Sequence, residues 1–253
     1  MSAPLLIFDF DNTLEEFNPY EEAVENEIFQ KLGSKYLVDP AKMRQVFDNI
    51  KLSYAHPRAL PTDYGRHVWF SETFHVFHIH EPVHEWVKYY WEQVFSRVRV
   101  FPGVYDILGQ LKEHHTMCIL SDSDGDLKIK LQRIEQLGLR KYFDAIFTSD
   151  MAGHNKPNPR MFLQVLEHYK LCAEDCIMIG DSPEIDLATA KELGMSTIWQ
   201  KQCLARHHVN KHFEYVDFEI ESIRDLPMAI CQLEEKMSRP LEAFCPVPLP
   251  HSK

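Results

Sequence analysis

Residues 5–14 read LLIFDFDNTL, an apolar run that ends in two aspartates, Asp9 and Asp11, one residue apart. A short run of aliphatic and aromatic residues is typical of a strand buried in a parallel sheet. Acidic side chains at the carboxyl end of such a strand lie where open α/β sheets bind their ligands. Turns are also rich in aspartate because its side chain bonds to the local backbone, so the pair alone is also compatible with a plain turn.

The composition is that of an ordinary globular chain. Its 253 residues are 45% hydrophobic and 26% charged, enough for one large domain or two modest ones. The formal net charge of -11 disfavours non-specific binding to nucleic acid or to an anionic membrane. No apolar stretch is long enough to span a bilayer, and the first residues lack a basic segment and a cleavage site. We therefore expect neither a nucleic-acid nor a membrane partner.

The six cysteines include no Cys-x-x-Cys pair, and two of them, Cys118 and Cys176, lie in apolar, strand-like runs. This usage is typical of reduced and mostly buried thiols, and it predicts a cytoplasmic protein.

From about residue 100 onward, short apolar runs alternate with amphipathic stretches. The runs cover residues 117–120, 145–147, 176–179 and 197–199. One of the stretches between them places four apolar residues on a single helical face: Leu127, Leu131, Ile134 and Leu137. Alternating strands and helices predict βαβ units and a parallel sheet with right-handed crossovers, and the run at 5–9 belongs to that sheet.

Residues 18–97 have a different texture, with three amphipathic helical patterns and no credible strand. We expect an all-helical domain over 18–97, inserted into an α/β core formed by 1–17 and 98–253. Within that core, residues 215–218 predict an edge strand that is followed by a helix, and the proline-rich end from about 240 to 253 predicts a loose tail.

Each of the first four predicted core strands ends in polar residues. These ends carry Asp9 and Asp11, then the run 121–124, then 148–150 followed by Lys156, and finally the run 180–186. The carboxyl ends of parallel strands share one edge, so these groups converge on a single site. Several carboxylates cannot stay ionised together without a cation, and hard oxygen ligands favour Mg²⁺.

In order along the chain, the DFDNTL stretch at 9–14, Ser121, the Lys156-Pro157 pair and the run from Gly180-Asp181 to Asp186 resemble the four motifs of the haloacid dehalogenase superfamily. The segment 101–104 resembles the return from that family's cap. The resemblance covers about two-thirds of the chain. It implies a Rossmann-like parallel-sheet core, an inserted helical cap of the C1 type, and a phosphatase acting on a small phosphorylated metabolite.

The resemblance also implies a role for each matching residue. Asp9 would be the nucleophile that forms an aspartyl-phosphate, and it would also be a ligand of Mg²⁺. Asp11 would be the general acid and base, and its backbone carbonyl would bind the metal. The need for a nucleophile and a proton shuttle agrees with general chemistry, because two steps replace one difficult displacement.

The remaining motifs supply the metal and phosphate contacts. The resemblance implies that Asp181 completes the metal site and that Asp186 supports Lys156 or the metal. Ser121 and Lys156 would hold the transferring phosphoryl group, for which a hydroxyl and a point positive charge are suited.

One residue departs from the family's pattern. Asp122 follows Ser121, where the family usually carries asparagine or a glycine-like residue. A carboxylate aimed at phosphate would repel it, so we expect the Asp122 side chain to turn away while its backbone N–H serves the phosphate. The aspartates at 122, 124 and 126 also resemble the start of a calcium loop. The EF-hand pattern, however, requires a glycine at position 127 and a glutamate at position 133, where this chain has leucine and arginine.

Four cap histidines, His75, His78, His80 and His84, raise the alternative of a zinc site. No cysteine lies nearby, so capping, packing or substrate contact is the favoured interpretation.

Three rival functions stay open for the core. A haloacid dehalogenase would lack the second aspartate of the first motif, because a halide leaving group needs no proton. A phosphoglucomutase-like transferase keeps both aspartates. A non-catalytic binding protein of this fold would have lost the nucleophile, the lysine or a metal carboxylate. The substrate and the oligomeric state lie beyond the sequence.

Overall fold

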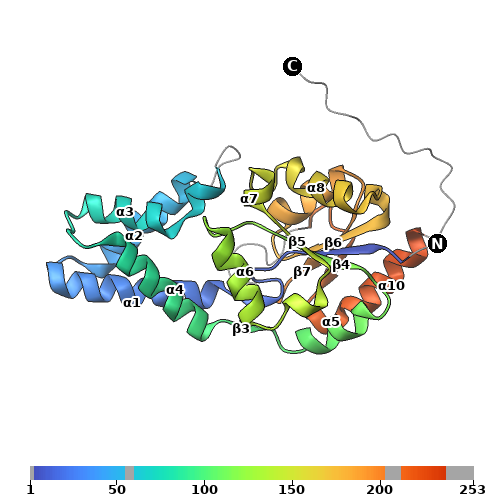
Figure 1. Cartoon of the computed structure of the whole chain (residues 1–253), viewed down its shortest axis with the longest axis horizontal. Helices are drawn as coiled ribbons and strands as arrows, with labels where there is room; N and C mark the ends of the chain where they lie inside the picture. The colour runs from blue at the N-terminus through green and yellow to red at the C-terminus, as the bar shows by residue number, and fades with distance from the viewer. Residues whose placement is uncertain (1–2, 55–59, 203–211, 238–253) are drawn as a thin grey trace, which may run out of the picture.

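Six short strands form one parallel sheet in the order β5-β4-β1-β6-β7-β8 (Figure 1). The structure, a computed structural model, describes residues 3–54, 60–202 and 212–237. The strands are β1 (Leu5–Phe8), β4 (Met117–Ser121), β5 (Ala145–Thr148), β6 (Cys176–Gly180), β7 (Ser196–Gln200) and β8 (Phe218–Ile220). The predicted α/β class is confirmed. The edge strand begins at Phe218, where the sequence pattern had placed its end.

Helices cover both faces of the sheet (Figure 1). Alternate side chains of β1 point to opposite faces, so Leu5 and Ile7 join one apolar cluster while Leu6 and Phe8 join the other. The helices packed on the Leu6 face are α5 (Val104–Lys112), α6 (Leu127–Gln136) and α10 (Leu226–Met237). Those on the Leu5 face are α7 (Ser149–Ala152), α8 (Pro159–Tyr169) and α9 (Ala188–Glu192). Burial on both sides explains why β1 reads as a continuous apolar run.

The segment predicted to be a helical cap forms a separate cluster of helices beyond one edge of the core, at the left of Figure 1. Its elements are α1 (Asn18–Tyr36), α2 (Pro40–Tyr54), η1 (Pro61–Tyr64), α3 (Arg66–Val76) and α4 (Val83–Arg97). Phe47 lies at the centre of its apolar cluster, with ring centroids 5.2 Å from Phe29 and 5.1 Å from Phe70.

A short antiparallel ribbon links this cluster to the core. Strand β2 (Glu15–Glu16) carries the chain out of the core and pairs with β3 (Arg99–Val100), which brings the chain back. The domain limits at residues 17/18 and 97/98 remain a prediction, and they coincide with the start of α1 and the end of α4.

The buried face of α6 differs from the predicted one. Leu131 is 39% exposed, whereas Lys130 and Arg133 are fully buried beside Ile134. The helix is thus rotated so that a cationic stripe, rather than a purely apolar one, faces the interior. The ion pairs made by that stripe outweigh the burial of one leucine, because an unpaired buried charge would cost far more than an exposed side chain.

The structure describes some of the cysteines, but it does not describe the others or the predicted tail. Cys118 and Cys176 are buried free thiols whose pKa burial raises, and Cys231 is an exposed free thiol. Cys203, Cys245 and the predicted tail at 240–253 lie outside the described residues. Within the described segments, no helix has the length and apolarity needed to cross a membrane.

Candidate active site

The loop after β1 presents Asp9 at the carboxyl edge of the sheet. The Asp9 carboxylate accepts a hydrogen bond of 3.0 Å from the Thr13 hydroxyl, and its backbone N–H donates to Ile179 of β6 over 2.8 Å. Asn12 adopts a left-handed conformation (φ 58°), and its side-chain oxygen accepts from the backbone N–H of Phe17 at the start of α1. The loop therefore fixes the first aspartate and also directs the chain into the first cap helix.

Lys156 joins the ends of two neighbouring strands. Its ammonium lies 2.5 Å from an Asp9 oxygen and 2.7 Å from an Asp186 oxygen, and it also donates to the Leu120 carbonyl over 3.3 Å. Burial works against the charged lysine, but Asp186 and Asp9 hold the pKa of Lys156 above its ordinary value. Lys156 is therefore a permanent positive charge at this edge.

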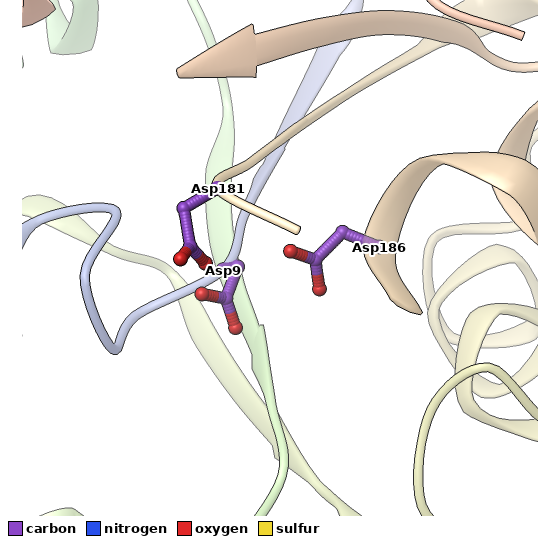
Figure 2. A group of neighbouring side chains, drawn as sticks. All are labelled: Asp9, Asp181 and Asp186. Carbon is purple, nitrogen blue, oxygen red and sulfur yellow. The ribbon is translucent and has the colours of Figure 1, made fainter. Parts of the chain in front are cut away.

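Asp9, Asp181 and Asp186 form a compact acidic group (Figure 2). One oxygen from each lies within 4.8 Å of the other two. Gly180 allows this approach, because a Cβ at that position would lie 2.6 Å from Asp186 Cβ. Burial raises the pKa of Asp186 to about 7, and burial with the charges of Asp186 and Asp9 raises the pKa of Asp181 well above its ordinary value. Hard oxygen donors that repel one another suit a divalent cation such as Mg²⁺.

Ser121 and Asp122 follow β4 at the same edge. Ser121 is buried, and its hydroxyl donates to the Asp122 carbonyl over 3.2 Å. The Asp122 carboxylate accepts the backbone N–H of Lys156 over 2.9 Å, and burial raises the pKa of Asp122 to about 6. This side chain therefore holds the loop that carries the lysine. That the Asp122 backbone N–H serves a phosphate stays a prediction.

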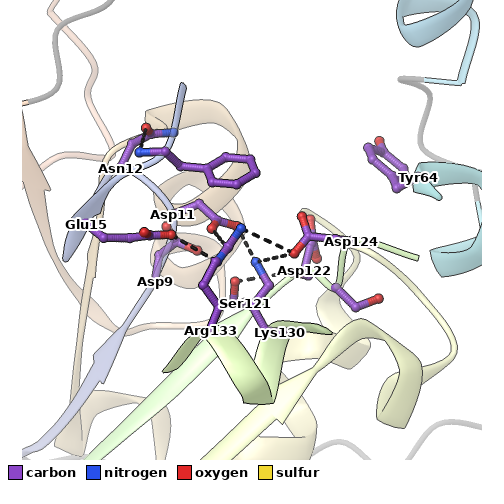
Figure 3. A network of polar contacts seen from close by, with 12 residues as sticks. Asp9, Asp11, Asn12, Glu15, Tyr64, Ser121, Asp122, Asp124, Lys130 and Arg133 are labelled. Atoms are coloured by element: carbon purple, nitrogen blue, oxygen red, sulfur yellow. Dashed lines mark hydrogen bonds and ion pairs between the residues drawn. The ribbon is translucent and has the colours of Figure 1, made fainter. Parts of the chain in front are cut away.

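Asp11 does not join the acidic group through its carboxylate. Its two oxygens bind Lys130 and Arg133 of α6 instead (Figure 3). Neither cation is among the residues with a predicted role. Their spacing, three residues apart on a helix directly after the second motif, was a signal that could have identified them.

The cap touches the core next to this site. Gly125 belongs to the loop that precedes α6. Its backbone is in direct contact with the backbone of Gly65 in the cap. In the same place the cap residue Arg66 lies 3.9 Å from Asp124 of the core, and both side chains are buried. Tyr64 approaches from the cap side, as Figure 3 shows. The cap thus docks on the loop that follows Ser121.

We expect the substitution Gly125→Ala to disrupt this docking. An added Cβ would lie 2.6 Å from the Gly65 backbone nitrogen, so the two loops must separate. Gly125→Ala should lower kcat/KM by about tenfold or more, since a small misplacement of the cap disturbs substrate positioning. Steady-state kinetics would measure the loss of kcat/KM, and thermal unfolding would measure the effect of the disrupted docking on stability.

Gly138→Ala is the matched control. Gly138 has a similar positive φ (65°, against 82° at Gly125), but a Cβ there meets no atom within 4 Å. Both variants carry the same backbone penalty of about 1 kcal/mol. Equal losses of kcat/KM in the two variants would contradict a role for the Gly65–Gly125 contact.

The structure favours structural explanations for two other candidates. Among the described residues, the acidic group above is the sole set of three side chains arranged for a metal, and the four cap histidines are exposed. Asp126, in the calcium-loop-like run, caps α6 by accepting the backbone N–H of Lys128 over 2.9 Å.

The chain is similar to known proteins in sequence and in fold. The sequence model of a family described as haloacid dehalogenase-like hydrolase matches residues 6–200. The glyceraldehyde 3-phosphate phosphatase of Pyrococcus furiosus is 30% identical over 142 residues, which cover 56% of this chain and 58% of that enzyme. The pyrimidine 5′-nucleotidase PynA of Streptococcus pneumoniae is 24% identical over 230 residues, 87% of this chain and 92% of that enzyme.

A solved structure shows the shared fold. The crystal structure of an HAD phosphatase from Thermococcus onnurineus superposes with a TM-score of 0.67 at 23% identity, covering 91% of this chain and 98% of that one. The sequence match to the glyceraldehyde 3-phosphate phosphatases of the two Pyrococcus species spans a little over half of their length, 58% and 55%.

Proposed function

The chain belongs to the haloacid dehalogenase-like hydrolase family, and from that premise we propose that it is a Mg²⁺-dependent phosphatase acting on a small phosphorylated metabolite. The observation that carries the proposal is the group of Asp9, Asp181 and Asp186, in which Lys156 bridges Asp9 and Asp186. Paired carboxylates with a fixed cation at a strand edge suit phosphoryl transfer, where positioning and charge neutralisation do most of the catalysis.

In the first step, an Asp9 oxygen attacks phosphorus, and the bond from phosphorus to the leaving oxygen breaks. Asp11 gives its proton to that oxygen, so the product leaves as an alcohol and Asp9 becomes an aspartyl-phosphate. Lys156 and Ser121 hold the phosphoryl oxygens through charge and hydrogen bonding.

In the second step, the Asp11 carboxylate accepts a proton from water. The water oxygen attacks phosphorus, the bond to Asp9 breaks, and inorganic phosphate is released. Asp9, Asp181 and the Asp11 carbonyl would hold Mg²⁺, with Asp186 orienting Lys156. When bound, the ion would neutralise the charge of the phosphoryl oxygens and offset the repulsion among the carboxylates.

Two relatives support the proposed substrate class. The Pyrococcus furiosus enzyme is named for glyceraldehyde 3-phosphate and PynA for pyrimidine 5′-nucleotides, which supports a small phosphate monoester as the substrate. The free thiols of Cys118, Cys176 and Cys231 support a cytoplasmic location. The net charge of -11 argues against nucleic acid or an anionic membrane as a partner.

A phosphatase screen tests the proposal. The purified chain would be assayed for phosphate release from sugar phosphates, nucleoside monophosphates and small acid phosphates, with Mg²⁺ and after chelation with EDTA. We expect turnover of at least one class, lowered at least about tenfold by EDTA and restored by Mg²⁺.

Two outcomes of the screen would reject the assignment. Turnover no greater than that of the Asp9→Asn variant on every class would exclude a phosphatase. Isomerisation of a sugar phosphate without net phosphate release would identify a mutase, and halide release from a 2-haloacid would identify a dehalogenase.

A further inference from the structure

Two cations on α6 are buried beside Asp11, although the proposed mechanism uses neither of them. Lys130 and Arg133 are both 0% exposed, and each binds one oxygen of the Asp11 carboxylate (Figure 3). Removing an ammonium and a guanidinium from water is strongly unfavourable unless their partners are well placed. Burial lowers the pKa of Arg133 to about 9, which still leaves it charged at neutral pH.

Further carboxylates lie at ion-pair distance from the two cations. Arg133 lies 3.1 Å from Glu15 and 3.6 Å from Asp124, and Lys130 lies 3.3 Å from Asp124. Neither cation can therefore rotate away from Asp11 without abandoning a second buried partner. The guanidinium of Arg133 also lies over the Phe17 ring, 4.1 Å from its centroid, which restricts it further.

The cluster is closed on its outer side by the docked cap. Arg66 of the cap approaches Asp124, and the same side chain binds Glu21 and donates to the Tyr90 hydroxyl over 3.0 Å. These side chains of the cap and of Asp124 are buried, so water screens the contacts among them weakly. The Asp11 side chain itself is 25% exposed.

We propose that Lys130 and Arg133 are positioning residues that orient the Asp11 carboxyl group for proton transfer to the leaving group. This inference rests on the proposed phosphatase function. Both Asp11 oxygens are fixed, and proton transfer requires a donor held within hydrogen-bond reach of the acceptor.

Substrates with different leaving groups distinguish a positioning role of Lys130 and Arg133 from a purely structural role. An alkyl phosphate requires a proton on its leaving oxygen, whereas p-nitrophenyl phosphate releases a stable phenolate without one. In Lys130→Met, we expect kcat/KM for the best alkyl phosphate of the screen to fall by about 30-fold or more, and kcat/KM for p-nitrophenyl phosphate by about threefold. The ratio kcat/KM is used because it covers only the steps up to departure of the leaving group, before the second step that both substrates share. Lys130→Arg should recover most of the alkyl phosphate rate, because it restores a cation of longer reach.

Lys128→Met is the matched control, since Lys128 is exposed on the same helix. It should alter neither rate. If Lys130→Met fails to fold, Arg133→Lys replaces it, because lysine keeps the charge but cannot contact Asp11 and Glu15 together. Arg133→Lys should also lower the rate with the alkyl phosphate more than the rate with p-nitrophenyl phosphate, but by a smaller factor than Lys130→Met.

Equal losses on the two substrates, or no loss on either, would overturn the positioning role. Such a result would leave the phosphatase function intact, because the wild type would still be active. The phosphatase proposal itself would fail on a different result, namely that the wild type releases no phosphate from either substrate.

Discussion

The substitution Asp9→Asn is expected to reduce kcat for phosphate release by at least about 1000-fold, since it removes the oxygen nucleophile of the first step. Asparagine has nearly the same shape as aspartate, so the Thr13 hydroxyl can still donate to it. The variant should therefore fold, as thermal unfolding would show. Acid quenching during turnover should trap covalent phosphate on the wild type and none on the variant.

The control for Asp9→Asn is Asp106→Asn, which alters an exposed aspartate in the first turn of α5. Its kcat should equal that of the wild type. If Asp9→Asn keeps more than about a tenth of the wild-type kcat, Asp9 is not the nucleophile.

The substitution Lys156→Met should cost both activity and stability. The lysine ammonium lies between Asp9 and Asp186, at 2.5 and 2.7 Å, and all three side chains are buried. Without it, two buried carboxylates lose their cation, which typically lowers the free energy of unfolding by about 3 kcal/mol. Loss of the charge on the phosphoryl group should lower kcat/KM by about 100-fold or more.

A double variant separates these two effects. Lys156→Met combined with Asp186→Asn removes one of the two uncompensated charges, so urea denaturation should show part of the lost stability restored. Its kcat/KM should stay as low as that of Lys156→Met, because the phosphate still lacks its cation. Recovery of activity in the double variant would show that Lys156 acts only through folding.

The sheet and the strand-end motifs could be predicted because their signals are local. The apolar run of β1 and those of the later strands each carry the mark of a strand buried on both faces. Since parallel strands share one carboxyl edge, the aspartates at the ends of β1 and β6 were expected to meet, together with Lys156. In the structure Lys156 bridges Asp9 and Asp186, while the catalytic roles of these residues remain predictions.

The environment of Asp11 could not be predicted in the same way. Lys130 and Arg133 lie about 120 residues away in sequence, and the apolar pattern of α6 indicated a different buried face. A helix that has a charged stripe beside an apolar stripe can bury either of the two stripes. Which stripe faces inward depends on the partners that the rest of the fold presents.

Local patterns in the chain were thus enough to predict the parallel sheet, the helical insertion and the strand ends that carry the candidate chemistry, because the spacing of apolar residues and the local charge specify these features. Three contacts became visible in the folded protein alone: Asp11 faces two buried cations, Asp122 binds the backbone of Lys156, and the cap docks through Gly65 on Gly125. Each of these contacts joins segments far apart in the chain. Their energy depends on burial and on the relative placement of whole helices and loops, which no local pattern encodes.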